Sequence, residues 1–287
     1  MTFSAIIPTY MRGETLLGTL EKLLNCSPPP SEILVHVDAG DEVTAPLVKS
    51  KYPQVRVISS DETQGPGGGR NKLTREATLE FVASFDDDSW PIGQGFFRDA
   101  KLVLDENPNV ALLACNIIER DEKPPDFDEP LLTLPPKVAS GFVGCGCVFR
   151  KSAFLQTSGY LPLRYAYGME ETDLSLQLYD LGWTIGFCDS MRVLHDCDRN
   201  QHHASREINA AQITNTALLA YLRYPIQFWP LGFAQTTNRV LYSIRNKRFR
   251  GIARGLLAIL PALWRNRKKR APVSAVAFRR WRTIKTT

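Results

Sequence analysis

Acidic residues are missing from the C-terminal part of the chain. From Ile208 to Thr287 there are 16 lysines and arginines but no aspartate or glutamate. Residues 1–207 carry 19 basic and 30 acidic side chains, a net charge of −11, so the overall charge of +5 hides a basic tail on an acidic body. Such a tail is typical of a segment that contacts an anionic surface, either a membrane or a nucleic acid.

Long apolar runs are also missing. The tail has apolar stretches at Tyr224–Ala234 and Gly255–Trp264, but each contains proline. Both are shorter than the roughly 20 residues that a membrane-spanning helix needs. We expect interfacial helices instead, with Trp229, Trp264 and Trp281 as candidate anchors in the membrane surface. The alternative is a solvated basic face that packs on the acidic domain.

Cysteine is too sparse and too irregularly spaced for a disulfide framework. There are six cysteines in 287 residues, which favours a reducing compartment. The N-terminus has no basic segment followed by a long apolar run, so we expect it to begin a strand and not to act as a signal peptide. With 44% hydrophobic and 23% charged residues, the composition excludes disordered, collagen-like and coiled-coil chains.

Strand-like and helix-like segments alternate in the first part of the chain. Strands are expected at Ser4–Pro8, Ile33–Val37, Val55–Ser59 and Phe81–Phe85. A leucine pattern predicts a helix around residues 16–24, and a second helix is expected near residues 71–80, after a glycine-rich loop at residues 65–69. Later elements are expected at Asn109–Ile118, at Gly141–Phe149 (a glycine-rich strand), at Glu171–Leu181 (a helix) and in a short strand that ends at Cys188. This alternation predicts an α/β fold with a mainly parallel sheet.

Two of the expected strands end in acidic residues. Asp38 follows the second strand, and Asp86, Asp87 and Asp88 follow the fourth. Because ligands of open α/β sheets bind beyond the carboxyl ends of the strands, these side chains would line one crevice. Carboxylate oxygens suit Mg²⁺ or Mn²⁺, which usually also hold substrate phosphates. A solvated acidic turn is the alternative interpretation of the triplet alone.

Other candidate groups lie further along the chain. An expected helix begins with Glu170, Glu171 and Asp173. The helix dipole stabilises carboxylates in a first turn, so these acids have a purely structural explanation. The same effect keeps a carboxylate ionised and available as a general base. His195 follows a strand and is either a structural residue or a metal ligand whose imidazole favours Mn²⁺ over Mg²⁺. Arg70 follows the glycine-rich loop and could approach a phosphate.

Taken in order, these segments resemble glycosyltransferase family 2, whose members have the GT-A fold. The resemblance runs from residue 3 to residue 195. It rests on Ile6–Tyr10, Val37–Gly40, Gly69–Asn71, Phe85–Asp88, Gly144–Gly146, Glu170–Leu174 and Val193–His195. The expected fold is therefore a GT-A, Rossmann-like α/β domain whose central sheet is flanked by helices, followed by a basic amphipathic helical extension.

The resemblance implies roles for individual residues. The triplet corresponds to the family's DXD motif, with Asp88 as the main ligand and His195 as the second ligand of Mn²⁺ or Mg²⁺. Glu171 lies where the family has its catalytic base, usually an aspartate. The nucleotide pocket would be lined by Pro8, Thr9, Asp38, Arg70, Asp86 and Asp87. The acceptor and donor-sugar region would include Gly144, Cys145, Gly146, Glu170 and Asp173.

Two departures from the family pattern bear on these roles. Gln177 stands where an arginine is common after the start of the acidic helix. The Gln-x-x-Arg-Trp signature of processive polysaccharide synthases is missing, since Ala277 precedes Arg280 and Trp281 where glutamine would be needed. The resemblance therefore implies the transfer of one sugar per encounter.

The implied function is metal-dependent, inverting transfer of one sugar from a UDP-, dTDP- or GDP-sugar to a hydroxyl acceptor. The acceptor would be a lipid-linked or cell-surface glycan precursor. Residues 1–207 would form the catalytic domain. Residues 208–287 would bind the anionic inner face of the cell membrane, so that the catalytic domain is held there on the cytoplasmic side. Nucleic-acid binding is not expected, because no recognised module is found and an acidic body repels phosphate. Residues 196–209, with His202 and His203, are a candidate lid.

Two other functions remain open. One is a non-catalytic, membrane-associated assembly protein of the same fold. The other is a sugar-phosphate nucleotidyltransferase, which would need an N-terminal glycine-rich triphosphate loop. Residues 8–15 contain only Gly13, which disfavours this second alternative.

Overall fold

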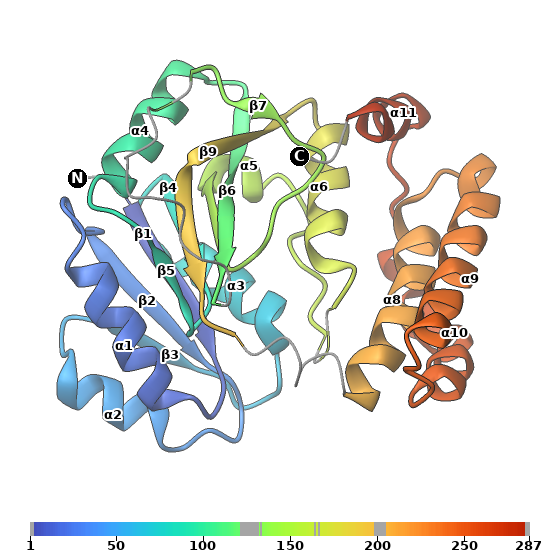
Figure 1. Cartoon of the computed structure of the whole chain (residues 1–287), viewed down its shortest axis with the longest axis horizontal. Coiled ribbons are helices and arrows are strands. Elements are labelled where there is room, and N and C mark those ends of the chain that lie inside the picture. The colour runs from blue at the N-terminus through green and yellow to red at the C-terminus, as the bar shows by residue number, and fades with distance from the viewer. Residues whose placement is uncertain are drawn as a thin grey trace. The chain divides into compact units, whose positions relative to one another are not determined.

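The computed structural model describes residues 3–120, 132, 134–163, 165, 167–197 and 205–284. The chain folds into two compact units (Figure 1). The first comprises Met1–Arg164, Trp183–Cys197 and Ile284–Thr287, and the second comprises Tyr165–Gly182 and Asp198–Thr283. The second unit thus combines most of the basic tail with the segment that contains the acidic helix.

Within the described residues, nine strands of the first unit form one sheet in the order β3-β2-β1-β4-β8-β6-β9-β5, with β7 beside β9. Their bounds are β1 Phe3–Thr9, β2 Glu32–Val37, β3 Arg56–Ser59, β4 Phe81–Phe85, β5 Ser89–Pro91, β6 Val110–Glu119, β7 Lys137–Val138, β8 Gly146–Arg150 and β9 Thr184–His195. The pairs among β3, β2, β1 and β4 are parallel. Strand β8 runs antiparallel to both of its neighbours, so the sheet is mixed beyond β4. The expected α/β architecture with a central sheet is confirmed.

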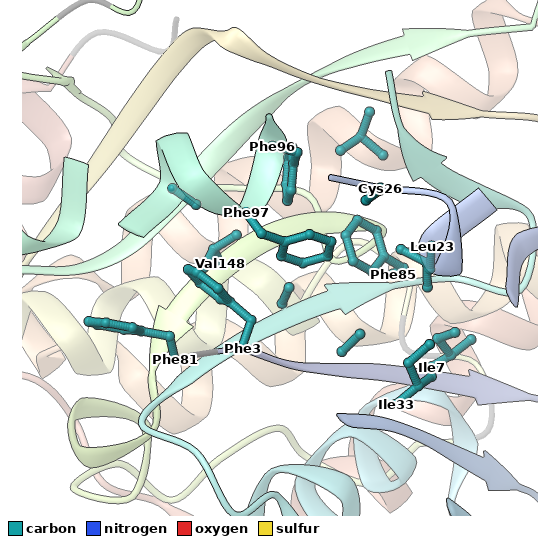
Figure 2. Close-up of a cluster of buried hydrophobic side chains, with 14 of the residues drawn as sticks. Phe3, Ile7, Leu23, Cys26, Ile33, Phe81, Phe85, Phe96, Phe97 and Val148 are labelled. Carbon is teal, nitrogen blue, oxygen red and sulfur yellow. The ribbon is translucent and has the colours of Figure 1, made fainter. Parts of the chain in front are cut away.

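Helices cover both faces of the parallel half of the sheet. The first unit contains α1 Gly13–Leu24, α2 Thr44–Lys51, α3 Gly65–Glu76, α4 Phe96–Glu106 and α5 Lys151–Phe154. All seven residues of β1 are buried, which is the usual state of a strand with helices on each side. Figure 2 shows the cluster on one face, where Phe3 and Ile7 of β1 meet Leu23 of α1 and Phe96 and Phe97 of α4.

The prediction of a loop at residues 65–69 is wrong, because α3 already begins at Gly65. Glycine weakens a helix, but two local features favour one here. The side chain of Asp38 accepts hydrogen bonds from the N–H groups of Gln64 (2.8 Å) and Gly65 (3.0 Å), at the helix start. At Gly69, a β-carbon would lie 2.6 Å from Nδ1 of His36, so glycine lets the helix approach the sheet closely.

The glycine-rich segment and the strand before His195 also differ from expectation. Only Gly146–Arg150 of the former is a strand, and Gly146 closes a turn by donating its N–H to the carbonyl of Val143 (3.1 Å). Strand β9 continues past Cys188, where a register shift against β6 lets it extend to His195. This extension brings His195 opposite Glu119 of β6.

The regular secondary structure in the described residues of the second unit is all helical, with turns and short irregular segments between the helices. It contains α6 Glu170–Asp180, α8 Arg206–Arg223, η1 Ile226–Phe228, α9 Trp229–Arg245, α10 Ile252–Asn266, η2 Arg267–Lys269 and α11 Ala275–Thr283. Helices α8, α9 and α10 lie side by side (Figure 1), and small residues allow their close contact. A β-carbon at Gly232 would lie 2.3 Å from that of Ala220, and one at Gly255 would lie 2.8 Å from the carbonyl oxygen of Ala210. No helix among the described residues is long and apolar enough to cross a bilayer.

Candidate active site

The three consecutive aspartates lie directly after β4, at the carboxyl end of the parallel strands. Asp87 and Asp88 are buried, whereas the side chain of Asp86 is 32% exposed. Thr9, the last residue of β1, donates its hydroxyl to Asp87 at 2.8 Å. Thr19 of α1 donates to the backbone carbonyl of Asp87 at 2.7 Å. The triplet is therefore held in place by the neighbouring strand and helix.

Two arginines balance the charge of the triplet. Arg12 reaches Asp87 at 2.8 Å with one terminal nitrogen and Asp88 at 2.7 Å with the other. Arg70 is buried, pairs with Asp86 and donates from Nε to Ser84 at 3.1 Å. Arg70 was among the expected site residues, but Arg12 was not. The sequence indicated only that three adjacent carboxylates need cations nearby, and it did not single out Arg12 as one of them.

The two buried aspartates differ in their protonation. Burial raises the pKa of Asp87 to about 7, although Arg12 and Thr9 act in the opposite direction. Burial alone would also raise the pKa of Asp88, but hydrogen bonds with His195 and Arg12 outweigh it and lower that pKa to about 2. Asp88 is therefore the carboxylate that stays ionised over the physiological range, as a metal ligand must.

His195 lies at the end of β9, next to the triplet. Its Nε2 is 3.5 Å from Asp88, and its Nδ1 is 3.6 Å from Glu119 of β6. The sulfur of Cys197 lies 3.5 Å from the same Nδ1. A histidine that binds metal through one ring nitrogen commonly donates from the other to a carboxylate. Glu119 occupies that second position, and nothing in the local sequence indicated it.

The donor atoms around His195 fit a divalent cation. Asp86, Cys145 and His195 each offer one ligand atom, and these atoms lie within 4.8 Å of one another. The same holds for Glu119, His195 and Cys197. Each of these two sets also contains a cysteine sulfur, and neither contains Asp88, whose carboxylate lies 3.5 Å from Nε2 of His195. Carboxylate oxygens with one imidazole suit Mn²⁺ better than Mg²⁺, which prefers oxygen alone. The structure thus brings together Asp88 and His195, the two expected ligands.

The remaining expected residues of the first unit have structural partners. Both oxygens of Asp38 accept backbone N–H groups, including that of Ala39 at 3.0 Å. The carbonyl of Gly144 accepts from Ser84 at 3.0 Å, and that of Cys145 accepts from Ser89 at 2.7 Å. Pro8 lies against Gly69 of α3. Gly146 is closely packed as well, because a β-carbon there would lie 2.5 Å from Ile117. The segment that holds Gly144 and Cys145 is therefore fixed to β4 and β5, the strands on either side of the aspartates.

The acidic helix α6 belongs to the second unit and is described with it. Of its three first-turn acids, Glu170 and Asp173 are buried, whereas Glu171 is partly exposed. Asp173 forms a bidentate ion pair with Arg223 of α8 and accepts from Gln177 at 3.3 Å. The guanidinium that pairs with Asp173 thus comes from Arg223 of α8, and position 177 contributes an amide donor. The candidate lid residues His202 and His203 lie outside the described residues.

Comparison with known sequences identifies the family. The model of glycosyl transferase family 2 matches residues 4–156. An uncharacterized glycosyltransferase of Bacillus subtilis, YwdF, is 33% identical over 92 residues, which are 31% of this chain and 34% of YwdF. The poly(ribitol-phosphate) β-N-acetylglucosaminyltransferase TarS of Staphylococcus aureus is 31% identical over 118 residues, which are 39% of this chain and 20% of TarS. The match therefore spans about a third of YwdF and about a fifth of TarS.

Solved structures extend the likeness to the fold of nearly the whole chain. The mannosyltransferase PcManGT of Pyrobaculum calidifontis, in complex with GDP-Man and Mn²⁺, has a TM-score of 0.62 at 18% identity, over 98% of this chain and 79% of that one. The structure of GalNAc-T7 with UDP, GalNAc and Mn²⁺ gives 0.61 at 14% identity, over 79% and 48% of the two chains. At such low identity these likenesses establish the architecture only. The family match and the sheet with its acidic strand end agree: the chain belongs to glycosyl transferase family 2 and has the GT-A fold.

Proposed function

We propose that this protein is a metal-dependent inverting glycosyltransferase that moves one sugar from a nucleotide-sugar donor to a hydroxyl acceptor. One observation carries the proposal: Asp86–Asp88, His195, Arg12 and Arg70 converge at the carboxyl end of β4. Such a group of carboxylates, imidazole and guanidinium groups suits a cation together with a diphosphate. The solved complexes of PcManGT with GDP-Man and Mn²⁺ and of GalNAc-T7 with UDP, GalNAc and Mn²⁺ support it.

The residues of the first unit would bind the donor. Asp88 and His195 would hold Mn²⁺ or Mg²⁺, with Asp86 beside them and Glu119 orienting the imidazole. The bound cation would supply Lewis-acid stabilisation of the diphosphate leaving group. Pro8, Thr9, Asp38, Arg70 and Asp87 would line the nucleotide pocket, as the family resemblance implies. The side chain of Arg12, which is 43% exposed, can contact both the acidic triplet and an approaching phosphate.

Glu171 would be the catalytic base. It would remove the proton of the acceptor hydroxyl while that oxygen forms a bond to the anomeric carbon, on the face opposite the nucleotide. The bond from the anomeric carbon to the diphosphate oxygen would break at the same time, and the configuration would invert. General-base assistance is typically worth about 10²–10⁴ in rate. Support comes from the exposure of Glu171, because Asp173 is engaged by Arg223.

The basic tail would hold the enzyme at the inner face of the cell membrane, where a lipid-linked or cell-surface glycan precursor is the acceptor. Each Lys or Arg near an anionic bilayer contributes about 1 kcal/mol. The described tail helices contain arginine and lysine but no acidic residue after Glu207. The domain division at residue 207 and the cytoplasmic location are part of this proposal.

A thermal-shift panel tests donor binding. The melting temperature is measured with UDP, dTDP, GDP and CMP, each with and without Mn²⁺. A ligand at about 100 times its Kd stabilises the folded state by about 2.7 kcal/mol. We expect one nucleotide to stabilise the protein only with Mn²⁺, and Asp88→Asn to lose that effect. If no nucleotide gives a metal-dependent shift, the non-catalytic alternative replaces the proposal.

A matched pair of variants tests the base. Glu171→Gln is expected to abolish sugar transfer while it keeps the metal-dependent nucleotide shift. Glu106→Gln makes the same chemical change at an exposed glutamate of α4 that has no expected role in the site, and it is expected to retain most of the transfer activity. Equal activity of Glu171→Gln and the unmodified protein would refute the assignment of Glu171.

A further inference from the structure

An apolar cavity lies within the second unit, between α8, α9 and α10. Its volume is about 520 Å³, which is within the range of small-molecule sites. Almost all of its lining side chains are aliphatic or aromatic, and Ala217, Tyr221, Trp229 and Val240 are among them. The proposed transfer reaction does not use this cavity, so it requires a separate explanation.

Large apolar side chains near the cavity are exposed to solvent. Phe233, which lines the cavity, is 77% exposed, and Leu257, Leu260 and Trp264 of α10 are 80%, 76% and 68% exposed. Contiguous exposed apolar surface of this kind marks a contact with a membrane or a protein partner. Helix α10 therefore presents apolar side chains both toward the cavity and toward the solvent.

A positive charge lies against the aromatic wall of the cavity. The guanidinium of Arg270 is 5.7 Å from the ring centre of Tyr221 and 5.5 Å from that of Trp229. Arg267 lies over the ring of Trp264 at 4.0 Å. None of the ion pairs among the described residues involves Arg270, so its charge can serve an anion from outside. The occupant that matches these features has a hydrocarbon chain and an anionic group.

A second copy of this chain fits the surface less well. A twofold interface places the same patch of both subunits face to face, so the arginines and lysines of two tails would meet. The tail contains no acidic residue with which to pair them. An anionic bilayer supplies the missing negative charge together with apolar chains.

We propose that the cavity between α8, α9 and α10 takes one hydrocarbon chain of an anionic phospholipid, whose phosphate contacts Arg270. This proposal deepens the membrane contact proposed above and rests on it. It adds a defined site for a single chain to a contact that basic residues and exposed apolar side chains would otherwise make at the bilayer surface. It does not depend on the sugar-transfer chemistry of the first unit.

The test uses the full chain and vesicles of phosphatidylcholine, with or without phosphatidylglycerol whose acyl chains are brominated. Sedimentation measures vesicle binding, and bromine quenching of tryptophan fluorescence measures chain contact. Trp229→Phe identifies the part of the quenching that comes from the cavity. Ala217→Phe fills the cavity, whereas Leu257→Phe adds an aromatic ring on α10 outside it and is the matched control.

We expect Ala217→Phe to sediment with anionic vesicles like the unmodified protein but to lose the quenching assigned to Trp229. Leu257→Phe keeps both. Arg270→Gln and Lys268→Gln each weaken vesicle binding about fivefold, the equivalent of ~1 kcal/mol per basic residue. Only Arg270→Gln lowers the Trp229 quenching at saturating lipid.

Three results would overturn the proposal. Unchanged Trp229 quenching in Ala217→Phe would reject the cavity while the charged membrane contact survived. No sedimentation with either vesicle would reject the membrane contact as well, although the nucleotide panel would still test the transferase. Dimers in analytical ultracentrifugation that are lost in Ala217→Phe, without quenching by lipid, would identify a second copy as the occupant.

Discussion

Replacing Arg223 with methionine would leave a buried carboxylate of the second unit without its cation. Asp173 is 1% exposed, and Arg223 reaches both of its oxygens. In the variant, Gln177 would still donate to Asp173 from 3.3 Å, but this neutral amide cannot balance the charge. Removal of one partner of a buried ion pair typically costs about 3–5 kcal/mol, since the other charge stays buried. At about 2–4 °C per kcal/mol for a chain of this size class, Tm would fall by roughly 6–20 °C.

The pH dependence of this loss gives a second signature. Burial raises the pKa of Asp173, and Arg223 and Gln177 oppose that effect. Without Arg223 the pKa in the folded variant rises further, so the folded state binds a proton that the unfolded chain, with a pKa of about 3.9, has released. The variant therefore gains stability relative to the unmodified protein as the pH falls. The difference in Tm is largest at neutral pH and becomes smaller toward acid.

Scanning calorimetry of the full chain measures these shifts. Arg245→Met, which removes an exposed arginine of α9, is the control and should change Tm little. The double variant Asp173→Leu with Arg223→Met removes both charges and is expected to recover most of the stability, because apolar replacement of a whole buried pair is often neutral. The reasoning is refuted if Arg223→Met is no worse than Arg245→Met, or if the double variant is as unstable as Arg223→Met.

Three further predictions concern single sites. Gly69→Ala is expected to lower the free energy of unfolding in urea by about 1–3 kcal/mol, because its β-carbon would lie 2.6 Å from His36. Gly18→Ala, in open space on α1, should raise it by about 0.5–1 kcal/mol. Equal effects of the two variants would contradict the packing argument. Burial lowers the pKa of His36, so urea midpoints should fall as the pH drops below about 6.5, when the unfolded chain takes up a proton that the folded chain refuses; a His36→Gln variant with the same pH dependence would exclude this cause. Phe278→Ala, at a fully buried ring in α11, should cost about 3–5 kcal/mol by the same measurement, whereas Val276→Ala on the exposed side should cost little; similar losses would show that α11 is not packed as described.

The parallel core of the fold could be predicted from local sequence. The strands β1, β2 and β4 are short apolar runs bounded by turn residues, and each is buried nearly throughout. The position of Asp86–Asp88 followed from β4, because a residue after a parallel strand must lie at the carboxyl edge. These inferences need only the immediate neighbours of a residue in the chain.

Helices were harder to predict where local preference and packing disagree. Five consecutive residues at 65–69 include four glycines, and their helical state depends on the carboxylate of Asp38 and on close contact with β1 and β2. Helix α2 has a weak apolar pattern over Thr44–Lys51 and was not predicted. Helix α4 was also not predicted, although its buried residues recur at helical spacing, so that signal was present and was missed.

Charge partners from distant segments could not be predicted at all. Arg12 and Asp88 are 76 positions apart, and their contact depends on how β1 and β4 pair. Glu119 meets His195 only because β9 continues beyond a register shift. The arginine that the family pattern leads one to expect is absent at Gln177, and the guanidinium that pairs with Asp173 is that of Arg223, 50 positions after Asp173.

The division of the chain into units limits which segments can be exchanged between family members during evolution. The family match ends at residue 156, before α6, and the chain passes between the units around residues 164, 182, 197 and 283. A recombination event at residue 207 would replace the tail, and with it Arg223, but would keep Asp173. The buried carboxylate would then lack its partner cation. Extensions of this type are therefore expected to be inherited together with residues 165–182, so the helix that carries Glu171 and the basic tail helices would diverge as one module.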